Sequence, residues 1–207
     1  NLNRNYNILL SVQADAQNIL EELNKALNGE KRTMNVEAIE EINKYKTEHA
    51  AKIEKRKGNG ALHPATFLRE LRRCLPRDAI LATDVGYHQL WSISDFQVFE
   101  PGTYLTPTDY QAMGFGIPAA IGAAIAGPDK RVVCICGDGG FLISGFELLT
   151  AVREKMNLSV FVFNDGALGL IKGLQEKIYN RTVSVDLNNP DFEKLADSFG
   201  VRYFQVS

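Results

Sequence analysis

The fold of this protein is decided by residues 131–165, RVVCICGDGGFLISGFELLTAVREKMNLSVFVFND. Its apolar runs, 131–136 and 158–163, are continuous rather than alternating, which is typical of strands buried on both faces of a parallel sheet. The first run enters a glycine turn, and a helix predicted over 145–155 leads to the second run. The stretch therefore predicts one strand–helix–strand unit of a parallel sheet.

The neighbouring segments continue this alternation of strands and helices. Helices are expected over 64–74, 87–94, 113–126, 167–178 and 191–199, and strands over 79–86 and 201–206. From residue 61 onward the pattern predicts an α/β domain, a doubly wound parallel sheet with helices on both faces.

The N-terminal part has a different character. A short strand is expected over 7–12, followed by a helix over 16–27 that Asp15 caps. Charged residues then concentrate in 35–57, where only a thin apolar stripe remains. This pattern predicts a solvent-exposed linker helix.

Composition excludes several classes of protein. The 207 residues are 45% hydrophobic and 23% charged with a net charge of −2, which is ordinary for a globular protein. No apolar run is long enough to span a membrane. The near-zero net charge argues against nucleic-acid or membrane-surface binding. Cys134 and Cys136 lie in an apolar run, and three cysteines without a disulfide pattern or a signal peptide predict a reducing, cytoplasmic location.

Three turns at the carboxyl ends of predicted strands each contain an aspartate and a glycine. They are Asp84-Val85-Gly86, Gly137-Asp138-Gly139-Gly140 and Asn164-Asp165-Gly166. Ligands bind at this edge of such sheets, and glycines there let backbone N–H groups approach an anion. Because carboxylates repel an anion, acidic turns around a phosphate indicate a divalent cation, and oxygen ligands favour Mg²⁺ or Ca²⁺ over zinc. Asp138 and Asp165 close consecutive strands of one unit, so both can face one ion.

Residues 137–165 resemble the cofactor-binding motif of thiamine-diphosphate-dependent enzymes, which begins with Gly-Asp-Gly and ends with Asn-Asn. Asn164 matches the first Asn, and Asp165 stands where the second is usual. Two further segments, TDVGYHQLW (83–91) and AMGFGIPAAIGAAIAGPDKRVV (112–133), are similar to segments of acetolactate (acetohydroxyacid) synthases.

The resemblance implies a domain organisation. Residues 1–29 would be a remnant of the family's central domain, and residues 30–60 a charged helical linker. Residues 61–207 would be the thiamine-diphosphate-binding domain, cut short at its C-terminus. The chain is therefore expected to be a piece of a longer polypeptide.

The resemblance also assigns the site residues. Asp138 and Asp165 would bind Mg²⁺ through their side chains, and Ala167 through its carbonyl. Residues from three segments would surround the diphosphate: Gly86, Tyr87, His88, Gly137, Gly139, Gly140, Leu168 and Gly169.

Two more positions concern the reactive half of the cofactor. Met113 would lie under the thiazolium ring and force the bent, reactive cofactor conformation, which makes it the expected catalytic position. Gln111 would offer its backbone carbonyl to the 4′-amino group. Tyr87 and Gln111 depart from the family, which often has Gln at the first position and usually Gly at the second.

The implied activity is decarboxylation or ligation of 2-oxo acids with thiamine diphosphate and Mg²⁺, while FAD is left open. Family members take an activating Glu from the pyrimidine-binding domain of a neighbouring subunit, and no segment here resembles that domain. The chain alone is therefore expected to be inactive, and the protein to be a homodimer or homotetramer.

Other functions remain open at this stage. Within the same superfamily, the alternative is a simple 2-oxo-acid decarboxylase or oxidase. From another class, it is a non-catalytic phosphate- or nucleotide-binding or assembly module. A nucleotide-binding module would predict a G-x-G-x-x-G turn or a P-loop, and the sequence has neither. Plain structural roles are open for Met113, as a core residue, and for His88.

Overall fold

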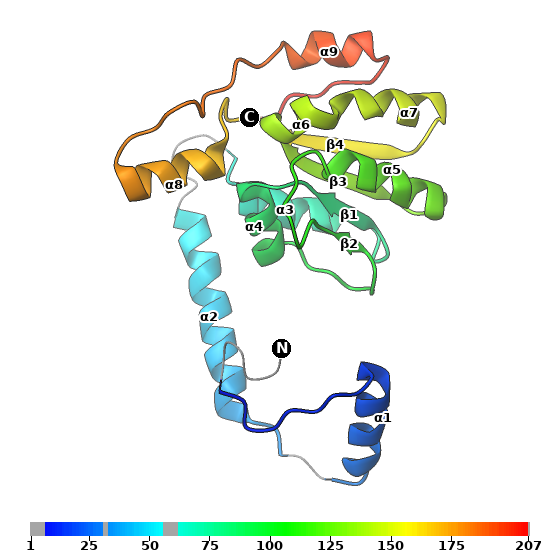
Figure 1. Cartoon of the computed structure of the whole chain (residues 1–207), viewed down its shortest axis with the longest axis vertical. Coiled ribbons are helices and arrows are strands. Elements are labelled where there is room, and N and C mark those ends of the chain that lie inside the picture. The colour runs from blue at the N-terminus through cyan, green and yellow to red at the C-terminus, as the bar shows by residue number, and fades with distance from the viewer. Residues whose placement is uncertain (1–6, 31–32, 56–61, 207) are drawn as a thin grey trace. The chain divides into compact units, whose positions relative to one another are not determined.

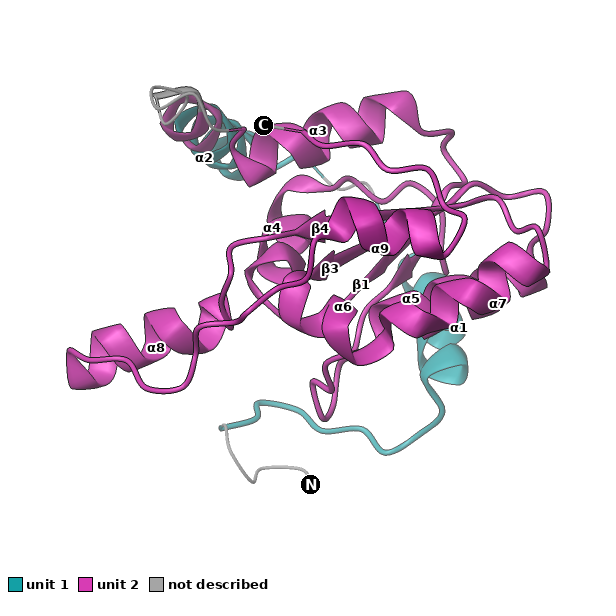
Figure 2. Cartoon of the chain, turned by 90° about the horizontal axis from the view of Figure 1, so that it is seen from above, with its two compact units in different colours: residues 1–48 teal, residues 49–207 magenta. Residues whose placement is uncertain are grey.

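The computed structural model describes residues 7–30, 33–55 and 62–206 (Figure 1). The chain divides into two compact units, Asn1–Glu48 and His49–Ser207, and the boundary falls within one helix (Figure 2). Among the described helices, none has the length and apolar composition needed to cross a membrane.

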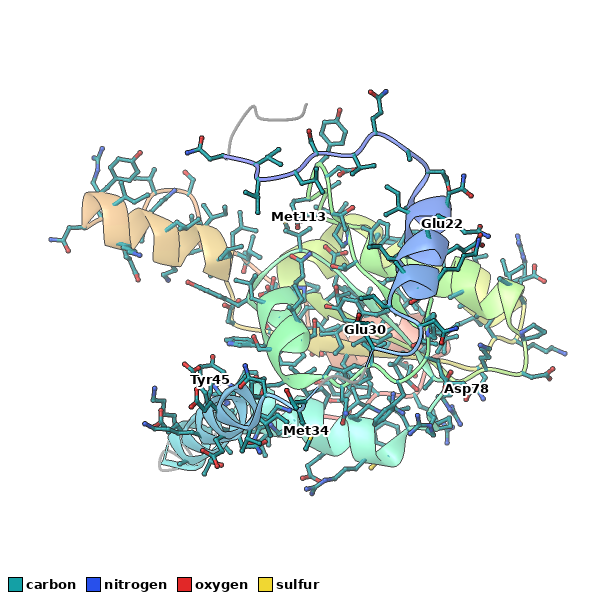
Figure 3. The ribbon with its side chains drawn as sticks, turned by 90° about the horizontal axis from the view of Figure 1, so that it is seen from below. Glu22, Glu30, Met34, Tyr45, Asp78 and Met113 are labelled. Atoms are coloured by element: carbon teal, nitrogen blue, oxygen red, sulfur yellow. The ribbon has the colours of Figure 1, made fainter. Side chains whose placement is uncertain are left out.

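The first unit contains helix α1 (Ala16–Ala26) and most of helix α2 (Val36–Lys55). Asp15 caps α1 as predicted, because its Oδ1 accepts the N–H of Gln17 at 2.9 Å. The expected strand over 7–12 is wrong: no described segment pairs with it, and a strand needs a neighbour for its backbone groups. No described side chain of residues 7–48 is buried, as Glu22 on α1 illustrates (Figure 3). The expected end of the linker helix at 57 lies outside the described residues.

The second unit alternates helices and strands along the chain. Its elements are α3 (Pro64–Cys74), β1 (Ile80–Thr83), α4 (Tyr87–Asp95), β2 (Tyr104–Leu105), α5 (Gly116–Ala126), β3 (Val132–Gly137), α6 (Asp138–Ser144), the 3-10 helix η2 (Gly145–Glu147), α7 (Leu148–Arg153), β4 (Leu158–Phe163), α8 (Gly169–Tyr179) and α9 (Phe192–Ser198). Proline at the first turn of α3 and the Asp191 cap of α9 begin those helices where the sequence predicts.

The four strands that the structure describes are all parallel, in the order β2-β1-β3-β4. Alternate residues of β3 enter two separate cores. Val132, Cys134 and Cys136 pack with α5 and α7, whereas Val133 and Ile135 pack with α3 and α4. Helices therefore cover both faces of the sheet, and the predicted doubly wound α/β fold is confirmed.

Several local predictions differ from the structure. The expected strand over 201–206 is wrong, because this exposed segment pairs with no described strand. Helix α5 begins at Gly116 rather than 113, since the preceding residues form a loop. The Gly-Asp-Gly-Gly run is not a turn, because α6 begins at Asp138. The short strand β2 had no signal in the sequence.

Candidate functional site

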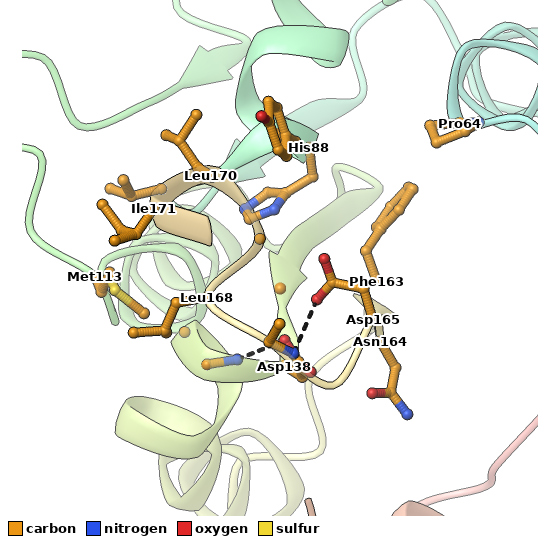
Figure 4. A pocket seen from close by; sticks show the side chains of 18 of the residues that line it. Pro64, His88, Met113, Asp138, Phe163, Asn164, Asp165, Leu168, Leu170 and Ile171 are labelled. Atoms are coloured by element: carbon orange, nitrogen blue, oxygen red, sulfur yellow. Dashed lines mark hydrogen bonds between the residues drawn. The ribbon is translucent and has the colours of Figure 1, made fainter. Parts of the chain in front are cut away.

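A pocket of about 250 Å³ opens at the carboxyl ends of β1, β3 and β4 (Figure 4). The strand order places it at the point where the chain reverses its direction of progress through the sheet, between β1 and β3, which is where doubly wound sheets bind ligands. Every predicted site residue except Gln111 lines this pocket. The fold thus brings together three segments that are far apart in the sequence.

Strand register sets the centre of the site. Gly137 of β3 pairs with Phe163 of β4, so the next residues, Asp138 and Asn164, leave neighbouring strands side by side. Only 1% of Asp138 is exposed, and its carboxylate accepts three hydrogen bonds. The Gly139 N–H donates to Oδ1 at 2.9 Å, whereas the Gly166 N–H at 2.8 Å and Asn189 Nδ2 at 2.6 Å donate to Oδ2.

The hydrogen bonds of Asp138 leave room for a ligand. An ionised carboxylate has about four lone-pair positions, and three are in use here. The remaining position is on Oδ1, which accepts a single hydrogen bond. Asp138 can therefore bind a cation through one oxygen without losing any of these contacts.

Asp165 supplies a second carboxylate to the pocket. Partial burial, followed by the negative charge of Asp138, raises the pKa of Asp165. Lys172 opposes this rise, but its ammonium is already paired with Asp186 at 2.9 Å. Two carboxylates that repel each other beside a pocket are the electrostatic condition that a bound cation relieves.

The carbonyl of Ala167 is directed to the same side as the Asp165 carboxylate. Residues 166–168 pair with 185–187: the Gly166 carbonyl accepts the Leu187 N–H, and the Leu168 N–H donates to Val185. Because backbone groups alternate in direction along an extended chain, those of Ala167 point away from that partner segment. The Ala167 N–H accordingly donates to Asp165 Oδ1 at 3.3 Å, and its carbonyl shares that direction.

This donor set suits Mg²⁺. Among the residues that the structure describes, no three His, Cys, Asp or Glu side chains gather as a metal cluster. Two carboxylates and a carbonyl would leave coordination positions of Mg²⁺ that other oxygens could fill. Mg²⁺ commonly binds in this way, through one or two carboxylates together with phosphate and water.

His88 brings an unpaired polar atom to the pocket lining. Only 4% of the residue is exposed, and burial lowers its pKa to about 4, although Asp84 and Asp138 oppose the shift. Its imidazole stacks on the ring of Phe163, with 6.2 Å between the ring centroids. Its Nε2 is buried without a hydrogen-bond partner among the described residues, and a polar atom of a ligand could satisfy it.

The opposite wall of the pocket is apolar. Met113, Leu168, Leu170 and Ile171 lie away from the two carboxylates (Figure 4). A Cβ at Gly139 would lie 2.8 Å from Leu168 Cδ2 and 3.1 Å from Met113 Cε, so both side chains pack against a glycine backbone. A ligand with an anionic end and an apolar ring fits this division.

These features coincide with a family match. Residues 84–207 match the profile of the family described as thiamine pyrophosphate enzyme, C-terminal TPP binding domain. The chain belongs to this family. Its TPP-binding domain is acetolactate synthase-like, because the similar curated proteins carry that name.

The similar proteins come from distant organisms. An acetolactate synthase of Bacillus subtilis is 39% identical over 144 residues, which cover 70% of this chain and 25% of that protein. The isozyme 2 large subunit of Escherichia coli is 36% identical over 68% of this chain and 26% of its own length. A probable large subunit of Methanococcus aeolicus is 31% identical over 97% of this chain and 36% of its own length. The chain thus spans about a quarter to a third of these relatives.

Asp84 of the TPP-binding domain differs from Asp138 and Asp165, the other two aspartates at strand ends. It is fully buried, outside the pocket lining, and accepts N–H groups from Val85, Gly114 and Gly116. A Cβ at Gly140 would lie 2.9 Å from its carboxylate carbon. Asp84 therefore fixes the loop that carries Met113. The rest of its turn still faces the pocket, because Val85 and Gly86 line it.

The structure bears on three predicted contacts of the TPP-binding domain, those of Gln111, Leu168 and Gly139. Gln111 is exposed, lies outside the pocket lining, and its side chain donates from Nε2 to the carbonyl of Pro107 at 2.8 Å. The contact expected of its backbone carbonyl stays a prediction. The φ of 49° at Gln111 is a conformation that glycine adopts more readily, which gives a physical reason for the Gly usual at this position.

The Leu168 N–H already donates to Val185 at 2.7 Å, which leaves Gly169 as the predicted donor at the start of α8. The Gly139 N–H likewise already donates to Asp138 Oδ1, which leaves Gly140 as the predicted donor at the start of α6.

Tyr87 has a packing role in this domain. Its ring stacks on Trp91 at 5.7 Å, and its hydroxyl occupies the space that a side chain at Gly173 of α8 would need. The departure from Gln at this position is thus matched by a glycine on the facing helix.

Sequence reasoning missed Asn189, which contacts both Asp138 and Asn164. No signal in the chain alone pointed to it, because 51 residues separate it from Asp138.

Proposed function

We propose that this chain is the cofactor-binding part of an acetolactate synthase-like enzyme that uses thiamine diphosphate and Mg²⁺ to decarboxylate or ligate 2-oxo acids. The observation that carries the proposal is the pair Asp138 and Asp165 beside one pocket, with the pKa of Asp165 raised in part by the charge of Asp138. The names of the similar proteins support the acetolactate synthase class.

In this proposal Asp138 Oδ1, the Asp165 carboxylate and the Ala167 carbonyl hold Mg²⁺. With a cation bound there, the charge of the two carboxylates would be neutralised and would no longer repel a diphosphate. The space for that diphosphate is bordered by two side chains, those of Tyr87 and His88, and by the backbone of five glycines: Gly86, Gly137, Gly139, Gly140 and Gly169.

The cofactor supplies the electron sink that loss of carbon dioxide from a 2-oxo acid requires. This chain's residues contribute binding and orientation. Met113 supports the ring of the cofactor from the apolar wall, and its loop is fixed because Asp84 holds the N–H groups of Gly114 and Gly116. Leu170 and Ile171 add apolar side chains to that side of the pocket.

The remaining parts of the enzyme are proposed from outside this chain. An activating Glu would come from a pyrimidine-binding domain of a neighbouring subunit, in a cytoplasmic homodimer or homotetramer. The chain by itself would then bind the cofactor without turnover. We propose no flavin site within it. A simple decarboxylase or oxidase would use the same residues, and the product test below separates these activities.

The test of cofactor binding is calorimetry of the 207-residue chain with Mg²⁺ and thiamine diphosphate. Binding is expected to require both components, and Asp138→Ala is expected to weaken it about 100-fold or more, since it removes a direct metal ligand. Asp129→Ala is the matched control. Asp129 is an exposed aspartate that precedes β3, whereas Asp138 follows β3. Equal binding by Asp138→Ala and the control would refute the proposed site.

The activity is tested on the full-length protein with a panel of 2-oxo acids. Carbon dioxide together with acetolactate-type products supports the synthase, whereas carbon dioxide with a free aldehyde supports a simple decarboxylase. Carbon dioxide with a carboxylic acid or its activated derivative, formed only when an electron acceptor is reduced, supports an oxidase. Absence of turnover on every 2-oxo acid, despite cofactor binding, would contradict the proposed activity.

A further inference from the structure

Asn189 lies in the segment between α8 and α9, outside the residues that line the pocket. Its Nδ2 donates to Asp138 Oδ2 at 2.6 Å and to Asn164 Oδ1 at 2.8 Å. One amide group thus joins the two residues that leave the neighbouring strands β3 and β4.

Chemistry fixes the orientation of this amide. A carboxylate oxygen is only an acceptor, so the NH₂ side of Asn189 must face Asp138. On its other side, Oδ1 is buried and has no partner among the described residues. The hydrogen bonds described for the Asn189 side chain are therefore both made to residues at the strand ends beside the pocket, Asp138 and Asn164.

The contact determines which oxygen of Asp138 remains free. Oδ2 accepts from both Gly166 and Asn189, which saturates it, whereas Oδ1 accepts only from Gly139. The amide of Asn189 thereby restrains rotation of the carboxylate and leaves Oδ1 available.

The segment that carries Asn189 is itself anchored. Asp191 caps α9 by accepting the N–H groups of Glu193 and Lys194, each at 3.1 Å. The ring of Phe192 packs edge-on against Phe141 of α6 at 5.6 Å. Asp138, the acceptor, is the first residue of α6, and Asn189, the donor, lies three residues before Phe192. The packing of Phe192 against Phe141 therefore holds donor and acceptor near each other.

We propose that Asn189 is a positioning residue of the metal site, which orients the Asp138 carboxylate toward a divalent cation and holds Asn164 beside it. This inference rests on the proposed function. Residues that hydrogen-bond to a metal ligand and orient it, without touching the metal, typically contribute about 10- to 100-fold to metal affinity.

The test uses Mn²⁺ as a spectroscopic probe. Free Mn²⁺ is counted by electron paramagnetic resonance in the 207-residue chain at saturating thiamine diphosphate, for the unaltered protein, Asn189→Leu and Asn188→Leu. Leucine nearly matches asparagine in size and removes both donors. Asn188 is the matched control, because it is the exposed neighbour of Asn189. Thermal unfolding of each metal-free protein is followed in parallel.

Asn189→Leu is expected to raise the Mn²⁺ dissociation constant by about tenfold or more, with an unfolding temperature close to that of Asn188→Leu. Asn189→Ser, which retains one donor, is expected to fall between the two. Unchanged Mn²⁺ affinity in Asn189→Leu would overturn the inference, and a lowered unfolding temperature alone would reduce Asn189 to a structural role. Failure of the unaltered chain to bind Mn²⁺ would instead refute the proposed function, and the inference with it.

Discussion

Asp84 and Asp138 are alike in sequence but differ in what their carboxylates face. Each follows a parallel strand, is 1% exposed or less, and accepts the N–H of the next residue together with two donors from distant segments. Asp84 is enclosed by glycines, since a Cβ at Gly140 would lie 2.9 Å from its carboxylate carbon and a Cβ at Gly116 would lie 3.2 Å from its Oδ2. Asp138 instead borders the pocket and a second carboxylate, that of Asp165.

The two buried carboxylates therefore have different uses. At Asp84 the backbone N–H groups satisfy the charge, and the product is a rigid loop before α5. At Asp138 part of the charge remains available, and the residue can serve an external cation. Both carboxylates accept three hydrogen bonds, so hydrogen bonds alone do not distinguish them. The difference is that Asp138 borders the pocket and Asp84 does not.

The largest expected effect concerns the enclosed carboxylate. Asp84→Ala leaves the N–H groups of Gly114 and Gly116 buried without partners, so it is expected to lower the free energy of unfolding by about 3 kcal/mol. Asp138→Ala is expected to cost about 1 kcal/mol less in metal-free protein, because it also removes the repulsion with Asp165. Urea unfolding of both variants without metal measures the difference. A larger loss in Asp138→Ala would reverse the comparison.

His88 probes the region between the two carboxylates. Its pKa of about 4 lies below the unfolded value of about 6.5, so the unfolded chain binds more protons between these values. Stability from this group is present above about pH 6.5 and is lost as pH falls toward 4, by about 3 kcal/mol in total.

The measurement for His88 is the free energy of urea unfolding at pH 4.5 and 7. His88→Phe keeps an aromatic ring on Phe163 and is expected to flatten the pH dependence relative to the unaltered protein. An unchanged slope in the variant would show that His88 is not the responsible group.

The smallest effect is expected at Asp165, where Asn is usual in the family. Asp165→Asn keeps an oxygen ligand, so the Mg²⁺ affinity is expected to change by less than about tenfold. The pKa of Asp165 is raised, so its ionisation destabilises the metal-free fold as pH rises above the ordinary aspartate range. The variant should therefore be more stable than the unaltered chain at pH 7 without metal. Calorimetry and urea unfolding check the two parts, and a lower metal-free stability would contradict the repulsion argument.

Local pattern predicted much of this molecule. The continuous apolar runs identified β3 and β4, and Asp15, Pro64 and Asp191 marked helix starts correctly. The expected strands over 7–12 and 201–206 were wrong because an apolar run becomes a strand only when another strand is available to pair with it.

The sequence by itself determined the family, the doubly wound fold and the aspartates at the strand ends, because periodicity and motif spacing are local properties. Tertiary structure alone decided the roles of the individual residues. It enclosed Asp84, left one oxygen of Asp138 open, moved Gln111 out of the pocket lining, and brought Asn189 to the site from 51 residues away. The physical reason is that a carboxylate's function depends on the donors and charges around it, and packing brings these together from distant parts of the chain.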